Sequence, residues 1–149
     1  MSANQEKWLS MPEEIYSKGR LELIDEMVAP DFVDHGSLPP GSPQGREGFK
    51  QFVRVLRQAF PDVHYEVDRA SSVDGGDLQA VNVTAHGTQT GEFMGLPPTG
   101  KQVTWQETHI GRFEDGWVKD HWGVVDMLAI FQQLGLVPMP GEQGQRPSA

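Results

Sequence analysis

Apolar residues recur at helical spacing in three parts of the chain. Residues 1–29 carry two apolar stripes that Gly19 separates, which predicts two short helices. A longer amphipathic helix is predicted over 47–60, and a short closing helix over 127–134. The stretch between the last two helices lacks this period, so we expect strands there.

Alternation of apolar and polar residues, which is typical of half-buried strands, marks four segments of that stretch. They are 63–68, 78–91, 102–113 and 118–125, and a short extended segment, 31–35, precedes them. Helices, strands and a closing helix that follow one another in separate groups favour an α+β fold. We expect a curved antiparallel sheet packed on N-terminal helices, with a pocket between the two layers.

Composition narrows the classes of function. A chain of 149 residues is the length of one domain, and its net charge of −9 disfavours nucleic acid and anionic membranes as partners. The absence of cysteine excludes disulfides and thiolate chemistry. The chain has no run of 18 apolar residues and no charged-then-apolar leader, so we expect a cytoplasmic protein.

Glycine and proline are concentrated rather than scattered. Two clusters, at 36–46 and 91–101, predict loops, and both are expected to frame the mouth of the pocket. The segment 138–149 is almost free of apolar residues, which predicts a disordered tail. The folded domain is therefore expected to span 1–137.

The dipeptide Asp115-Gly116 lies between two strand patterns and predicts a two-residue type I′ turn. An unbroken register from that turn brings four facing pairs to one side of the hairpin: Gly111 and Asp120, His109 and Trp122, Glu107 and Val124, Trp105 and Asp126. Two tryptophans among ionisable groups are typical of the wall of a small-molecule pocket, and not of a plain core or solvent face.

Each candidate residue has a structural and a functional interpretation. Asp126 either caps the closing helix or is a buried carboxylate whose raised pKa suits a general base. His109 is either a hydrogen-bonded core histidine or a group that polarises a substrate carbonyl. Glu107 is either a charge at the rim or a buried partner of His109 or of a tryptophan N–H. His35 either packs in its loop or lines the pocket, and Trp8 belongs either to the core or to a lid.

The remaining histidines are expected at surface or structural positions: His64, His86 and His121. Neither an HxxxH nor an HxH spacing occurs, so we expect no metal. The chain also lacks the GxSxG motif of serine hydrolases, a P-loop and a dinucleotide-binding GxGxxG motif.

The segment 91–101 (GEFMGLPPTGK) resembles the signature loop of the SnoaL-like polyketide cyclase family. Further segments match in the expected order: 32–35 (FVDH), 59–62 (AFPD), 112–116 (RFEDG), 121–126 (HWGVVD) and 132–135 (QQLG). The resemblance covers about residues 10–136, which is nearly the whole domain.

This resemblance implies a cone-shaped α+β barrel of the nuclear-transport-factor-2-like superfamily with a deep apolar pocket. It also implies an intramolecular aldol condensation that closes a polyketide ring without metal or cofactor, in a homodimer or homotetramer. Asp126 matches the family's general acid/base and His109 a pocket histidine. The substrate-binding residues we expect are His35, Trp105, Glu107, Trp122, Phe93 and Trp8.

The leading hypothesis is therefore a cofactor-independent cyclase that acts on a hydrophobic small molecule with carbonyl groups. One alternative is an isomerase or hydrolase on the same fold. Epoxide hydrolases of the superfamily need an Asp–Arg–Asp arrangement, and the nearest arginine, Arg112, is expected on the outer face. The other alternative is a module that binds a small molecule without converting it.

Overall fold

The elements of the protein follow the order that the sequence predicts. The structure, a computed structural model, describes residues 1–36, 40–138 and 140–141, so most of the predicted tail lies outside the described residues. Its elements are α1 (Ala3–Met11), η1 (Pro12–Ser17), α2 (Glu22–Met27), β1 (Val28–Asp34), α3 (Gly45–Ala59), β2 (His64–Gly75), β3 (Leu78–Thr88), β4 (Gln102–Glu114), β5 (Trp117–Val125) and α4 (Met127–Gln133). The predicted α+β class is confirmed.

One open sheet of five strands organises the molecule, in the order β1-β5-β4-β3-β2. The pairs from β2 to β5 are antiparallel, as predicted, whereas β1 joins β5 in parallel. The expected short segment 31–35 is thus part of a longer edge strand. Pro30 is tolerated inside it because an edge strand has one side without ladder hydrogen bonds.

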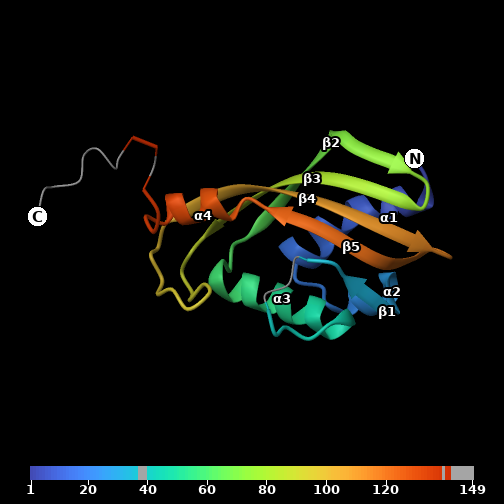
Figure 1. The fold of residues 1–149 in the computed structure, drawn as a ribbon, viewed down its shortest axis with the longest axis horizontal. Coiled ribbons are helices and arrows are strands. Elements are labelled where there is room, and N and C mark those ends of the chain that lie inside the picture. The colour runs from blue at the N-terminus through green and yellow to red at the C-terminus, as the bar shows by residue number, and fades with distance from the viewer. Residues whose placement is uncertain (37–39, 139, 142–149) are drawn as a thin grey trace, which may run out of the picture.

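The helices α1, η1 and α3 cover one face of this curved sheet, and α4 lies at one end of it (Figure 1). Helix α3 carries its apolar residues on one side and buries Phe49, Val53 and Leu56 against the sheet. Strand β4 alternates between buried and exposed residues along its whole length. We call the buried side of the sheet the inner face and the opposite side the outer face.

The β4–β5 hairpin has the predicted turn but not the predicted register. Asp115 and Gly116 both have positive φ, 52° and 80°, as a type I′ turn requires. After two pairs the register shifts, because Lys119 is an extra residue in β5. The facing pairs are therefore Gly111 with His121, His109 with Gly123 and Glu107 with Val125. The prediction of an unbroken register is wrong.

The shift has a physical reason in the carboxylate of Asp120. An unbroken register would turn this charge toward the apolar interior, where it would be costly to desolvate. With the bulge, Asp120 accepts hydrogen bonds from Arg112 Nε at 2.6 Å and lies 2.7 Å from His35 Nε2. A shift of one residue exchanges the two faces of a strand, so His121 turns inward and Trp122 outward.

Candidate active site

A cavity of about 550 Å³ lies between the inner face, α3, α4 and the loop that follows β3. Its wall is mainly apolar and includes Phe52, Leu56, Phe60, Phe93, Trp105, Val125, Met127 and Ile130. Among the described residues of the wall, Glu107 is the only one with an ionisable side chain. A concave apolar site with one convergent charged group is typical of small-molecule binding.

The loop at 91–101 contributes Phe93 to this wall. Buried Gln89 holds the loop: its Nε2 donates to the carbonyls of Gly91 and Pro97, and its Oε1 accepts from Thr99. Gly91 is needed for close approach, because a Cβ there would lie 1.9 Å from the Gln58 carbonyl oxygen. The ring of Phe93 then packs on Phe60 at 5.3 Å between centroids.

Glu107 begins a chain of four buried side chains that crosses three strands. Its Oε2 lies 2.6 Å from His109 Nε2, and His109 Nδ1 lies 2.8 Å from His121 Nε2. His121 Nδ1 in turn lies 3.1 Å from Asp34 Oδ2 on β1. The two imidazole rings stack with centroids 5.0 Å apart. We call these four residues the quartet.

Two further donors fix the carboxylate of Glu107. Its Oε1 accepts from Trp105 Nε1 at 2.7 Å and from the Tyr65 hydroxyl at 3.0 Å. Burial by itself would raise the pKa of Glu107, but the hydrogen bond and charge of His109, together with these two donors, lower it below its usual value. Burial, and then the nearby Glu107 carboxylate, raise the pKa of Tyr65 well above its usual value, so Tyr65 acts as a neutral donor.

The quartet joins two carboxylates through two imidazole rings. His109 has one ring nitrogen toward Glu107 and the other toward His121, and His121 has its second nitrogen toward Asp34. Imidazole nitrogens both donate and accept hydrogen bonds, so a chain of this kind is suited to acid/base chemistry.

Gly123 on β5 faces the quartet and also lines the cavity. A Cβ at this position would lie 2.9 Å from His109 Nδ1 and 3.0 Å from His121 Nε2. Any other residue would therefore displace the imidazole pair. Because Gly123 has no side chain, it lines the cavity while leaving room for the imidazole pair behind it.

The predicted site residues divide into three groups. Glu107, Trp105 and Phe93 line the cavity, and His109 adjoins Glu107. Trp8 is buried behind the quartet, where it lines a small void of about 20 Å³ together with His109 and His121. The third group lies outside the wall of the large cavity and is formed by His35, Trp122 and Asp126.

The bulge explains the third group. Trp122 is 39 % exposed and stacks on His35 with ring centroids 4.7 Å apart, so the expected wall of Trp105 beside Trp122 does not form. Asp126 is not opposite Trp105. It is exposed at the start of α4, where its Oδ1 accepts from the Ala129 N–H at 3.0 Å. The geometry of Asp126 is that of a helix N-cap.

Three residues of the site were missed in the sequence. His121 was expected on the opposite face, and Asp34 and Tyr65 were not singled out at all. Val118 and His121 are both buried although they are three residues apart, whereas regular alternation would place them on opposite faces. This odd spacing is the only sign of the bulge along β5. Asp34 has no local signal, because it meets His121 only through the pairing of β1 with β5.

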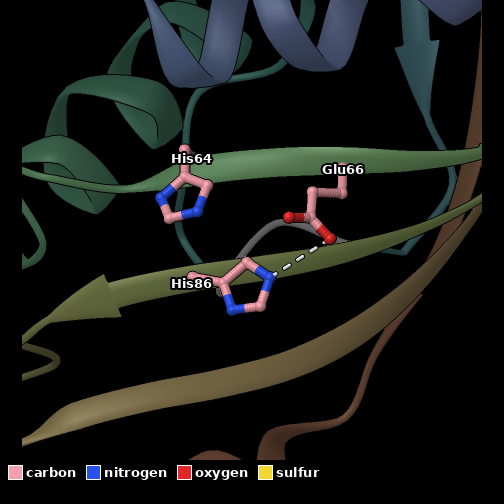
Figure 2. A group of neighbouring side chains, drawn as sticks. All are labelled: His64, Glu66 and His86. Carbon is pink, nitrogen blue, oxygen red and sulfur yellow. Dashed lines mark ion pairs between the residues drawn. The ribbon is translucent and has the colours of Figure 1, made fainter.

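The described residues also contain a second cluster of titratable side chains. His64, Glu66 and His86 bring their ligand atoms within 4.8 Å of one another, as three ligands of one metal ion would. The cluster lies on the outer face, because its neighbours Tyr65 and Ala85 are buried on the inner face (Figure 2).

Comparison with known proteins agrees with the fold. The model of the SnoaL-like polyketide cyclase family matches residues 6–134. The chain belongs to this family. It is 27 % identical to the nogalonic acid methyl ester cyclase of Streptomyces nogalater, over 89 % of this chain and 97 % of that protein.

Solved structures of two similar proteins have the same fold. IdmH of Streptomyces antibioticus, a proposed polyketide cyclase, is 34 % identical with a TM-score of 0.75, over 89 % of this chain and 98 % of IdmH. AclR of Streptomyces galilaeus, a proposed hydroxylase, is 29 % identical with a TM-score of 0.79, over 95 % of this chain and 87 % of AclR. In this SnoaL-like chain, no helix among the described residues is long and apolar enough to cross a membrane.

Proposed function

We propose that the protein is a polyketide cyclase that needs no cofactor and closes a ring by an intramolecular aldol reaction. Membership of the SnoaL-like family supports the reaction class. The observation that carries the proposal is the position of Glu107, the one ionisable side chain among the described residues of the cavity wall. The apolar surroundings suit a hydrophobic substrate, and the quartet supplies acid/base chemistry.

Glu107 is proposed as the group that takes the first proton. A C–H between two carbonyls is acidic enough for a carboxylate to remove its proton when the enolate charge is delocalised. The hydrogen bonds from His109, Trp105 and Tyr65 keep Glu107 ionised and aimed at the cavity. The proton neutralises the carboxylate while the negative charge passes to the enolate, so the net charge of the site and its substrate is unchanged.

His109 and His121 are proposed to stabilise the oxygen of the enolate. Gly123 lines the cavity and the imidazole pair lies directly behind it, so the dipoles of the two rings act on a substrate oxygen there without a direct hydrogen bond. The enolate carbon then attacks a second carbonyl carbon of the same molecule, and a C–C bond closes the ring. The alkoxide left on that carbonyl takes up the proton from Glu107, which restores the starting charge. Asp34 positions His121 and touches no reacting atom.

Asp126 has a separate role in this proposal. Its exposure and its hydrogen bond to the Ala129 N–H support a structural function as the N-cap of α4. The expected general acid/base function is therefore transferred to Glu107. The homodimer or homotetramer and the cytoplasmic location stay predictions.

Turnover of a ring-open polyketide tests the proposal. Two probes follow from the names of relatives: nogalonic acid methyl ester, from the cyclase of Streptomyces nogalater, and aklanonic acid methyl ester, from the 27 % identical cyclase DnrD of Streptomyces peucetius. We expect the wild-type chain to convert one of them, or a close analogue, into an isomer of equal mass with a new ring, followed by liquid chromatography and mass spectrometry. Saturable binding of these compounds without any product would contradict the proposal and favour a binding module.

A further inference from the structure

The outer face of the sheet carries a cluster of three potential metal ligands, unrelated to the cavity. His64 on β2 lies directly opposite His86 on β3, and their rings stack with centroids 4.8 Å apart. Glu66 follows His64 by two residues and therefore points to the same face (Figure 2). The cluster was not found in the sequence because its two histidines are adjacent only across the ladder.

His86 already has the arrangement of a metal ligand. Its Nδ1 lies 3.0 Å from the Thr104 hydroxyl oxygen on β4, whereas its Nε2 is buried and has no hydrogen-bond partner. If Nδ1 donates to Thr104, the lone pair of Nε2 is directed toward Glu66. Histidines that bind metals usually donate their other ring N–H to an oxygen in this way, which fixes the ring and its tautomer.

The distances fit a small tetrahedral ion. Two ligands bound to Zn²⁺ at its usual distance of about 2.0–2.1 Å are about 3.3 Å apart. The Nε2 of His86 and the nearer oxygen of Glu66 are 3.5 Å apart. All three ligand atoms lie within 4.8 Å, and the exposed side chains of His64 and Glu66 can close the remaining gap by a change of rotamer.

We propose that His64, Glu66 and His86 form a Zn²⁺ site on the outer face, with water as the fourth ligand. Two imidazoles and one carboxylate are a donor set that suits zinc among the common divalent ions. The site would link the edge strand β2 to β3. The quartet is a poorer candidate, because all four of its imidazole nitrogens already bond to other members.

Zinc titration of the full chain by calorimetry tests the proposal. We expect one zinc ion per chain and an increase in the melting temperature that EDTA reverses, because zinc bound to the folded state stabilises it. His64→Gln, Glu66→Gln and His86→Gln should each weaken binding at least tenfold, and Thr104→Val by about 10- to 100-fold through the orientation of His86. His35→Gln is the matched control, since His35 is exposed beside a carboxylate but has no second imidazole, and it should leave the affinity unchanged.

Two results would overturn the site. One is the absence of saturable zinc binding to the wild-type chain. The other is binding of undiminished affinity in the His64→Gln/His86→Gln double variant, which would place the zinc elsewhere. Circular dichroism of each variant without zinc shows whether it is folded, and folding is expected because these side chains lie on the outer face.

Discussion

Two pairs of histidines face each other across neighbouring strands of this sheet, and their surroundings give them different chemistry. On the inner face, His109 and His121 are buried and joined by a contact of 2.8 Å between ring nitrogens, with a carboxylate at each end. On the outer face, His64 and His86 stack with ring centroids 4.8 Å apart, and the Nε2 of His86 has no hydrogen-bond partner.

The difference shows that the partners of the ring nitrogens decide what a cross-strand histidine pair can do. On the inner face, all four ring nitrogens are bonded within one chain of side chains, which suits proton exchange. On the outer face, the Nε2 of His86 is buried without a hydrogen-bond partner, and its lone pair is left for a metal ion. The same residue type is thus proposed to serve acid/base chemistry on one face and metal binding on the other.

Removal of the Asp34 carboxylate, which bonds to the inner histidine pair, should have the largest effect on stability. Asp34→Ala removes a buried carboxylate that bonds to buried His121, and we expect a loss of about 3–5 kcal/mol in the free energy of unfolding. The matched outer substitution, His86→Gln in the absence of zinc, should change it by less than about 0.5 kcal/mol. Urea unfolding measures both, and equal losses would show that burial does not separate the two pairs.

Acid should weaken the inner face through Glu107. The pKa of Glu107 is lower in the folded chain than the value of about 4.3 expected when unfolded. Its contribution to stability is therefore present above about pH 4.3 and is lost as the pH falls through the folded pKa. Between about pH 5 and 3 the wild-type chain should lose more free energy of unfolding than Glu107→Gln. The exposed Glu114→Gln variant is the control, and parallel curves for Glu107→Gln and wild type would contradict the prediction.

The smallest effect is expected at Asp126. Asp126→Ala removes the N-cap of α4 and should cost about 1 kcal/mol, whereas Asp126→Asn should cost almost nothing, because asparagine caps as well as aspartate. Thermal unfolding of the two variants measures the difference. A large loss in Asp126→Asn would mean that the negative charge matters beyond its hydrogen bond to Ala129.

The sequence was informative wherever a single element decides the outcome. Within β4, alternation alone places Trp105, Glu107 and His109 on one face, and the structure agrees. The periodicity of α3 and the Asp115-Gly116 turn are local in the same sense. The parallel pairing of β1 with β5 joins segments far apart in the chain, and it was not predicted.

Alternation along β4 does not show which residues of other strands Glu107 and His109 meet. The bulge at Lys119 depends on whether Asp120 finds Arg112, which is a property of the folded hairpin. Asp34 and His121 are 87 residues apart in the chain. The quartet is therefore a product of tertiary structure, although one of its four members, His109, was expected to be catalytic.

The most direct test of the account is the rate of ring closure by Glu107→Gln relative to Asp126→Asn, with the same polyketide ester. Both variants replace a carboxylate by its amide and keep the shape of the side chain. If Glu107 takes the substrate proton, kcat should fall by about 10²–10⁴-fold in Glu107→Gln and stay within a few-fold of wild type in Asp126→Asn. A folded Glu107→Gln variant with normal kcat, or an inactive Asp126→Asn variant, would contradict the assignment of the catalytic carboxylate.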